Sequence, residues 1–243
     1  MENKLVLSWR NPVNRTWVSV GILEHKDEKF YFNYTNGAKD NDFIAFSQMN
    51  ELNKTYVSEE LFPLFKNRLL SKTRPEYEDF ISWLNIDKND SHDLKELSRS
   101  RGIRATDNLQ LFPYPEKDLY GNYEVLFFSH GVSHIAKHYV KRLLELKVND
   151  KLLIFKDIQN ESDSLALGLR TNEDPVELLG YCPSFFVSDF NKLLELNGAT
   201  EVNISVEKVN FDAPVQMKLL CKLKTRWPKN FEPFENDEFK KIL

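Results

Sequence analysis

Glycine is scarce in this chain, and each glycine stands alone. Only eight occur among 243 residues, and no two lie within nine residues of each other. Loops that cradle phosphates need closely spaced glycines, because backbone N–H groups must approach the phosphate oxygens. Nucleophile elbows of the Gly-x-Ser-x-Gly kind are also absent. The sequence therefore argues against an NTPase or a dinucleotide-binding enzyme, and it predicts a non-catalytic protein without a cofactor.

Cysteines and long apolar runs are lacking as well. Cys182 and Cys221 are the only cysteines, too few for a disulfide framework, and we expect both to be small buried hydrophobic residues. The chain has no run of about eighteen apolar residues. The opening MENKLVLSWRNP has no apolar core of a secretory signal. These absences predict a cytoplasmic protein without a membrane segment.

A surplus of positive charge is missing too. The net charge is −4, with 17 Lys and Arg against 19 Asp and Glu in residues 1–122, and 12 against 14 in residues 123–225. Non-specific nucleic-acid binding draws its affinity from cations that displace counterions along many phosphates. Any nucleic-acid contact must therefore be local. The 41% hydrophobic content, with 18 Phe, predicts a folded protein with room for two modules.

The first half of the sequence begins with strands and continues with helices. A meander of three strands is predicted over Leu5–Trp9, Thr16–Glu24 and Lys29–Tyr34. The segment SEELFPLFKNRLL then shows helical spacing, with Ser58 as its cap. Further helices are predicted from Pro75 and over His92–Ser100, and the run LQLF is predicted to be a strand that precedes a linker.

The second half alternates strands and helices in the order β-α-β-β-β-α-β-β. Its strands are YEVLFFSH, KLLIFKD, SLALGL, VELLGY, TEVNISVEKV and VQMKLLCKL, and its helices are AKHYVKRLLEL and Phe185–Glu195. This order predicts a small curled sheet with packed helices, and an α+β fold class for the whole chain. We expect modules over 1–118 and 119–225, and a loosely packed extension over 226–243.

Three histidines, His130, His134 and His138, stand four residues apart, the spacing that aligns imidazoles on one helix face for zinc. His130 ends a predicted strand and Gly131 interrupts the pattern, so we do not expect the three to share a helix face. We therefore favour an ordinary structural role for these histidines, and no metal site is predicted.

The densest basic patch is SRSRGIRATD, which contains Arg99, Arg101 and Arg104. Guanidinium groups bind phosphate or carboxylate in a bidentate manner, so the patch is a candidate site for a protein partner or a phosphate. The alternative is a solvated helix end, where cations interact favourably with the helix dipole and Gly102 ends the helix.

Residues 131–194 resemble the HIRAN domain. The residues that carry the resemblance are Gly131, the strand KLLIFKD, Asn160-Glu-Ser-Asp163, the strand SLALGL and Gly180-Tyr181-Cys182-Pro183. The resemblance implies an OB-like fold, and a site for single-stranded DNA at a 3′ end. The family pocket has an Arg-Tyr pair after the glycine and a Tyr-Asp pair in the turn, where this chain has Ser133-His134 and Ser162-Asp163.

The resemblance implies seven candidate residues for nucleic-acid binding: Ser133, His134, Asn160, Ser162, Asp163, Tyr181 and Phe185. Base stacking supplies much of the affinity for single strands, and a serine cannot stack. A structural interpretation stands beside this one, because Asn and Asp cap turns through their side chains, and phenylalanines on a helix are often core residues.

Residues 1–112 are similar to the small N-terminal subdomain of HipA-type toxin kinases. The similar segments are VSVGILEHKDEKFYFNYTNGA, EELFPLFKNRLL and DLKELSRSRGIRATDNLQLF, and no kinase core follows them. We expect a non-catalytic adaptor that binds DNA through its second module and a protein, such as a toxin kinase or a repair or defence enzyme, through its first. The alternative is an antitoxin-like regulatory subunit of a kinase system that acts by protein contact alone.

Overall fold

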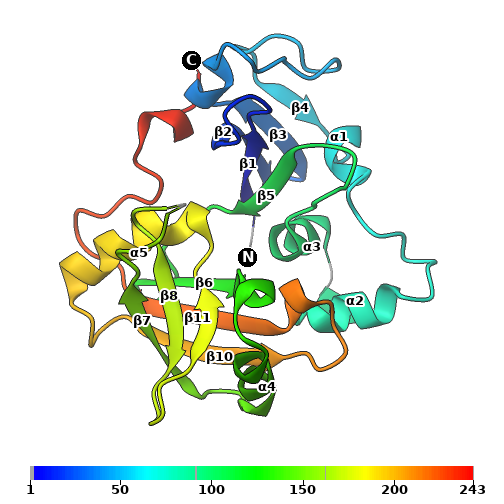
Figure 1. The fold of residues 1–243 in the computed structure, drawn as a ribbon. Coiled ribbons are helices and arrows are strands. Elements are labelled where there is room, and N and C mark those ends of the chain that lie inside the picture. Colours follow the sequence, from blue (N-terminus) through cyan, green and yellow to red (C-terminus); the bar gives the residue numbers. More distant parts are fainter. Residues whose placement is uncertain (1–2, 91, 162, 243) are drawn as a thin grey trace. The chain divides into compact units, whose positions relative to one another are not determined.

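The computed structural model describes residues 3–90, 92–161 and 163–242. The chain forms two compact units, which are described separately. Unit 1 comprises residues 1–82, 86–114 and 234–243, and unit 2 comprises 83–85 and 115–233. Both units contain strands and helices, and each has one antiparallel sheet (Figure 1), so the α+β prediction is confirmed. No helix in the described ranges combines the length and the apolar character that a membrane crossing requires.

Unit 1 is built on a five-stranded sheet in the order β4-β3-β2-β1-β5. The strands are β1 (Lys4–Arg10), β2 (Trp17–Lys26), β3 (Lys29–Tyr34), β4 (Tyr56–Ser58) and β5 (Leu109–Pro113). The helices are α1 (Pro63–Lys66), α2 (Tyr77–Trp83), whose last residue is assigned to unit 2, and α3 (Asp93–Ser100). The three predicted N-terminal strands and the strand LQLF are confirmed. Helix α3 also begins where expected, with the side chain of His92 accepting a hydrogen bond from the backbone of Lys95.

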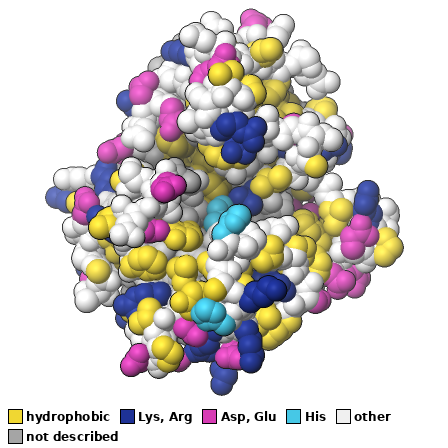
Figure 2. Space-filling model, in the orientation of Figure 1, with side chains coloured by type: hydrophobic (Ala, Val, Ile, Leu, Met, Phe, Trp, Pro, Cys, Tyr) yellow, Lys and Arg dark blue, Asp and Glu magenta, His cyan; other side chains and the backbone are white. Residues whose placement is uncertain are grey.

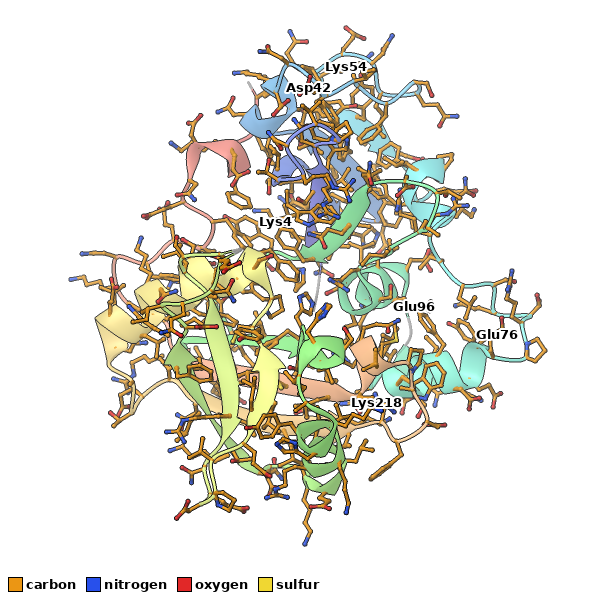
Figure 3. The ribbon with its side chains drawn as sticks, in the orientation of Figure 1. Lys4, Asp42, Lys54, Glu76, Glu96 and Lys218 are labelled. Atoms are coloured by element: carbon orange, nitrogen blue, oxygen red, sulfur yellow. The ribbon has the colours of Figure 1, made fainter. Side chains whose placement is uncertain are left out.

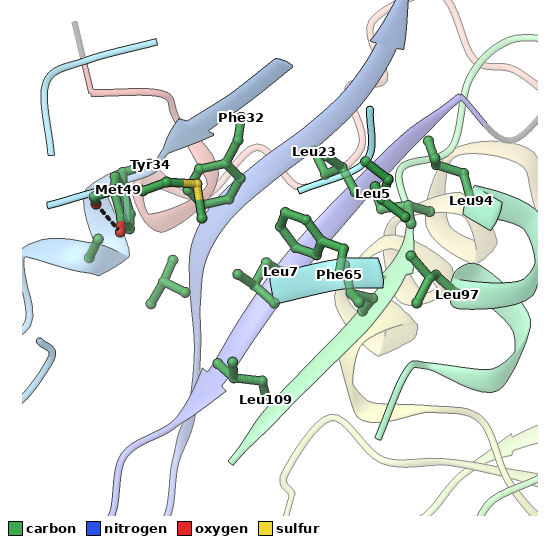
Figure 4. Packing of buried hydrophobic residues seen from close by; sticks show 14 residues of the cluster. Leu5, Leu7, Leu23, Phe32, Tyr34, Met49, Phe65, Leu94, Leu97 and Leu109 are labelled. Atoms are coloured by element: carbon green, nitrogen blue, oxygen red, sulfur yellow. Dashed lines mark hydrogen bonds between the residues drawn. The ribbon is translucent and has the colours of Figure 1, made fainter. Parts of the chain in front are cut away.

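One face of this sheet carries the core of unit 1. Alternate residues of β1, including Leu5 and Leu7, point to the same side and pack with Phe32, Phe65 and Leu97, as Figure 4 shows. The full cluster of buried residues is Leu5, Leu7, Val20, Leu23, Phe32, Tyr34, Ala38, Met49, Leu61, Phe65, Leu94, Leu97, Leu109 and Leu111. The Tyr34 hydroxyl, a polar group within this cluster, donates to the Met49 carbonyl over 2.6 Å.

The helix predicted to begin at Ser58 is wrong in extent. Ser58 is the last residue of β4 and lies opposite Phe30 of β3. The helix is one short turn, α1, which begins at Pro63 because proline has no N–H to donate and suits only a first helical position. The predicted apolar residue Phe65 is fully buried, so the hydrophobic spacing reports burial correctly although the helix is short.

The segment 226–243 is predicted to be a loosely packed extension, but in its described part, 226–242, the aromatic residues are packed. Phe231 and Phe234 are 3% and 6% exposed, because their rings join aromatic clusters. In unit 1, Phe234 packs against Phe112 and Tyr114, each at 5.5 Å between ring centroids. The Lys4 ammonium, labelled in Figure 3, lies 3.6 Å from the centroid of the Tyr114 ring. The last residues of this segment also pair with the sheet, since the Ile242 N–H donates to the Tyr34 carbonyl.

Unit 2 is built on a six-stranded antiparallel sheet in the order β6-β11-β10-β7-β8-β9. Its elements are β6 (Asn122–Phe128), α4 (Lys137–Glu145), β7 (Lys151–Lys156), β8 (Leu167–Thr171), β9 (Leu178–Tyr181), α5 (Ser184–Asn197), β10 (Asn203–Val209) and β11 (Leu219–Arg226). The predicted order of strands and helices is confirmed. Figure 1 shows the sheet curling, with β8 and β9 in front of β6, β11 and β10.

The interior of unit 2 takes the apolar residues that the sequence pattern indicated. Phe186 and Phe190 of α5 are fully buried, with their rings stacked at 5.3 Å between centroids. Cys182 and Cys221 are buried and free, as predicted. Burial raises the pKa of both thiols well above the ordinary value. Both thiols are therefore protonated at neutral pH, which suits a packing role.

The two edges of the curled sheet meet at one point, just after β6 ends. His130 and Tyr181 exchange two backbone hydrogen bonds of 2.9 Å, which link the chain after β6 to β9. Gly180, with φ +115°, makes this approach possible. A Cβ at Gly180 would lie 2.2 Å from the Ser129 hydroxyl oxygen and 2.5 Å from the His130 carbonyl oxygen. A side chain at position 180 is therefore incompatible with closure.

Replacing Gly180 tests the importance of this closure. We expect Gly180→Ala to lower the free energy of unfolding of unit 2 by about 2–4 kcal/mol, because backbone strain and steric overlap both contribute. Gly198→Ala is the matched control, since Gly198 also has a positive φ but a Cβ there would meet no atom within 4 Å. Its expected cost is about 1–2 kcal/mol. Equal losses in urea unfolding would contradict the steric argument.

Candidate functional site

The connection between β7 and β8, residues 157–166, is a turn held by its own polar groups. The Asp157 N–H donates to the Ala166 carbonyl over 3.0 Å and so closes the base of the turn. Within it, the Asn160 side-chain oxygen accepts from the Asp163 N–H over 3.0 Å, and one Asp163 carboxylate oxygen accepts from the Leu165 N–H over 2.9 Å. Asn160 and Asp163 therefore shape the turn, as the structural interpretation expects. Ser162 lies outside the described residues.

Tyr181 joins this turn to the closure of the sheet. Its hydroxyl donates to Asp157 Oδ2 over 2.9 Å, and the Asn160 amide nitrogen lies 3.5 Å from the same oxygen. The pKa of Tyr181 is raised, first by burial and then by the hydrogen bond to Asp157 and its negative charge. The phenol is therefore protonated throughout the physiological range, with its single proton directed at Asp157.

Gly131 lies against the Tyr181 ring on the other side of the closure. Its φ is +70°, and a Cβ there would lie 3.2 Å from a carbon of that ring. A side chain would therefore collide with the closure at Gly180 and crowd the Tyr181 ring at Gly131. Their spacing in the sequence reflects sheet geometry and needs no phosphate to explain it.

Ser133 and His134 are not brought into the turn. Both lie in a short 3-10 helix, Val132–His134, and both side chains are exposed. Among the described residues, neither side chain forms a hydrogen bond with the turn, and the His134 N–H donates to the Gly131 carbonyl. Phe185, in the first turn of α5, packs with Phe186 at 4.8 Å and with His130 at 6.1 Å between ring centroids.

The structure therefore assembles part of the predicted set. Asn160, Asp163 and Tyr181 meet at the turn, whereas Ser133 and His134 stand apart from it. Sequence reasoning missed Asp157, which binds Tyr181, because the two residues are 24 positions apart and no local pattern connects them. The only available signal was that Asp157 is the polar residue that ends an apolar strand.

The three histidines lie on three different elements. His130 takes part in the sheet closure, His134 belongs to the 3-10 helix and His138 is in the first turn of α4, where its ring lies 4.0 Å from that of Tyr139. They therefore do not form the helix face that zinc binding would need. Within the described residues, no group of three His, Cys, Asp or Glu side chains could hold a metal ion.

Positive charge is sparse in the turn, since residues 157–166 contain no Lys or Arg. Lys156, the last residue of β7, lies 3.8 Å from Glu195 of α5, so its charge is partly balanced. Figure 2 shows Lys and Arg interspersed with Asp and Glu over the face in view, without a broad basic area. The side chains described in the turn and beside Tyr181 mainly offer hydrogen-bond acceptors, the oxygens of Asp157, Asn160 and Asp163.

The arginines Arg99, Arg101 and Arg104 of unit 1 were interpreted either as a binding site for a partner or phosphate or as a solvated helix end. The structure fits neither interpretation for all three residues. Arg101 adopts the left-handed conformation at the end of α3, with φ +61°, and burial lowers the pKa of its guanidinium. A fully solvated helix end is therefore wrong for Arg101, because its side chain is largely removed from water. Arg104 is exposed in the loop that follows, and Arg99 lies in the last turn of α3.

The arginine that secures this helix end is Arg68, which the sequence did not single out. Its side chain is 2% exposed, donates to the Gly102 carbonyl over 2.8 Å and binds both carboxylate oxygens of Asp107. Gly102 has φ +53°, and a Cβ there would lie 3.4 Å from the Arg68 Cβ. A bidentate pair between the buried Arg68 side chain and the partly exposed Asp107 side chain thus fixes the loop that carries Arg104.

Unit 1 also has a groove of about 600 Å³ between the β2–β3 hairpin and the segment around Lys241. Its polar groups largely satisfy one another. The Asn33 amide donates to the Thr55 hydroxyl over 2.6 Å, and Lys241 lies 3.4 Å from Glu24. The lining is therefore of mixed charge and indicates no single class of ligand.

Comparisons with known proteins do not assign the chain to a family. No protein-family model matches it, and a search of curated proteins finds no match. Among solved structures, a structural-genomics target from Lactobacillus plantarum is similar, at 17% identity and a TM-score of 0.31. The match covers 44% of this chain and all of that protein. At this TM-score the likeness carries no argument about fold or function.

The buried arginine of unit 1 yields a stability prediction. We expect Arg68→Met to lower the free energy of unfolding by about 2 kcal/mol, because charged hydrogen bonds are lost and the Gly102 carbonyl stays buried. Lys66→Met is the control, since Lys66 pairs with Glu60 on the surface, and its expected cost is below about 0.5 kcal/mol. A similar midpoint for the two variants in urea unfolding would contradict the structural role of Arg68.

Proposed function

We propose that this protein is a non-catalytic adaptor whose unit 2 binds single-stranded DNA near a strand end. The observation that carries the proposal is the Asp157–Tyr181 hydrogen bond, which joins the turn of the HIRAN-like pattern to the sheet closure. An aromatic ring beside carboxylate and amide oxygens suits a nucleoside, whose sugar and base present hydroxyl and amino donors and a face for stacking.

The sparse positive charge defines the kind of DNA contact that this proposal allows. A site that neutralises few phosphates gains little from counterion release, so affinity must come from the terminal nucleoside rather than from the backbone. This agrees with the acidic balance of the chain. It also predicts weak, end-dependent binding in place of coating along a strand.

Fluorescence anisotropy with short labelled DNA tests the proposal. We expect single strands with a free 3′ end to bind more tightly than a duplex of the same length, with a log–log salt slope of only about −1 to −2, because few phosphates are contacted. Tyr181→Phe should weaken binding about three- to tenfold through loss of one hydrogen bond. Tyr120→Phe is the control. Tyr120 is exposed and precedes the first residue of β6, whereas the closure follows the last residue of this strand. Absence of binding to every DNA would contradict the proposal.

A second candidate function is protein interaction without nucleic acid, as an antitoxin-like regulatory subunit. It is favoured by two large apolar side chains on the same turn, Ile158 and Leu165, which are 89% and 50% exposed. Two exposed apolar side chains in one connection suit a surface that a partner covers.

Affinity purification from nuclease-treated host extract separates this second function from the first. If the turn binds a protein, the wild type should co-purify with a stoichiometric partner. The Ile158→Ser, Leu165→Ser double variant should then recover at least tenfold less of that partner, because the anchoring apolar contacts are gone. Phe211→Ser is the control, as Phe211 is 67% exposed in the loop after β10. Equal recovery with all three proteins would argue against this turn as the docking surface.

A further inference from the structure

Arg101, just after α3, carries a positive charge that no described residue balances. Its side chain is only partly exposed, and burial lowers the pKa of its guanidinium. Across the residues that the structure describes, this side chain forms no hydrogen bond, ion pair or ring contact. A charged group that loses water without gaining a partner is unfavourable, and such groups in proteins are usually paired. The charge of Arg101 is therefore unexplained by the fold alone.

The guanidinium of Arg101 can be reached from solvent. The side-chain atoms that are fully buried without a partner include the hydroxyl oxygens of Ser98 and Tyr123, but none of the Arg101 nitrogens. An arginine commonly packs its apolar stem against the protein and keeps its charged end at the surface. The N–H donors of Arg101 are thus partly desolvated and still open to an incoming acceptor.

The acidic residues nearest to Arg101 in the sequence, Glu96 and Asp107, are engaged by other donors. Asp107 binds Arg68 through both of its carboxylate oxygens. Glu96 is 2% exposed and accepts from the Tyr77 hydroxyl. Unit 1 therefore supplies Arg68 with a carboxylate and leaves Arg101, in the same region of the chain, without one.

The backbone of Arg101 is also unfavourable for a residue with a side chain. Its φ of +61° lies in the left-handed region, which glycine adopts without steric cost. The Arg101 carbonyl accepts from the Leu111 N–H of β5 over 2.8 Å, so pairing with the sheet edge holds this conformation. Strained residues with unsatisfied polar groups are typical of binding sites. The strain and the unpaired charge fall on the same residue.

The charge and shape of the donor group define the class of ligand. A guanidinium presents two parallel N–H groups that match the two oxygens of a carboxylate. Arg101 supplies one positive charge, which one carboxylate neutralises. A dianion such as phosphate would leave a surplus negative charge in a partly desolvated place, which is unfavourable. Arg104, the next arginine in the loop, is exposed, and water screens its charge.

We infer that Arg101 is the binding residue of a carboxylate site in unit 1. The carboxylate comes either from a small free acid or from an Asp or Glu side chain of another polypeptide, since both present the same two oxygens. Its binding to Arg101 would repeat, with an external ligand, the pair that Arg68 makes with Asp107. The site does not depend on the DNA binding proposed for unit 2.

Nuclear magnetic resonance of the isotope-labelled full chain tests the site directly. The Nε–H signal of Arg101 is identified by its loss in Arg101→Met. We expect sodium acetate to shift this signal saturably, with a Kd on the order of 10 mM for one bidentate pair. Sodium chloride at equal ionic strength should produce no saturable shift, and sulfate, a dianion, should bind more weakly than acetate. Arg104→Met is the control and should leave the acetate response unchanged.

A blocked tripeptide, acetyl-Ala-Glu-Ala-amide, separates the two sources of the carboxylate. Tighter binding of the peptide than of acetate would assign the site to a polypeptide ligand, and equal or weaker binding would assign it to a small acid. No saturable shift with either probe, or tighter binding of sulfate, would overturn the inference.

Urea unfolding distinguishes a binding role from a structural one. Arg101→Met keeps the apolar stem and removes the unpaired charge, so we expect its unfolding midpoint without ligand to equal or exceed that of the wild type. Arg68→Met, which breaks a formed pair, should have a lower midpoint. Acetate should raise the midpoint of the wild type, relative to chloride, but not that of Arg101→Met. A midpoint of Arg101→Met as low as that of Arg68→Met would show that Arg101 is structural and refute the inference.

Discussion

The structure of unit 2 depends on a steric condition at one place in its sheet. The chain after β6 and the end of β9 approach until His130 and Tyr181 share two backbone hydrogen bonds. That approach leaves no volume for a side chain at Gly180 and little at Gly131. Because backbone pairing is lost when strands separate even slightly, a single methyl group at this point opposes the whole closure.

The same closure also determines where the Tyr181 side chain lies. Tyr181 is the last residue of β9, so its backbone holds the sheet together while its side chain reaches Asp157 in the turn after β7. Tyr181 is thus fixed twice: its backbone pairs with His130, and its hydroxyl is bound by the Asp157 carboxylate.

Local pattern was a reliable guide to the strands and helices whose burial follows their own periodicity. The three N-terminal strands and the order of elements in unit 2 were predicted because the apolar residues of each segment recur at strand or helix spacing. The error at Ser58 arose because pairing with Phe30 across the sheet outweighed a good helical cap. Local patterns also cannot predict contacts between residues that are distant in the sequence. Arg68 binds Asp107, which lies 39 residues further along the chain, and no local motif marks either residue.

The membership of residues 234–243 in unit 1 has a consequence for biosynthesis. Unit 1 is assembled from segments that flank most of unit 2 in the sequence, and Phe234 covers Phe112 within it. Domains fold as their residues leave the ribosome, in order from the N-terminus. Residues 115–233 therefore emerge before unit 1 has all of its parts, so the second unit can be complete while the first still exposes the apolar ring of Phe112.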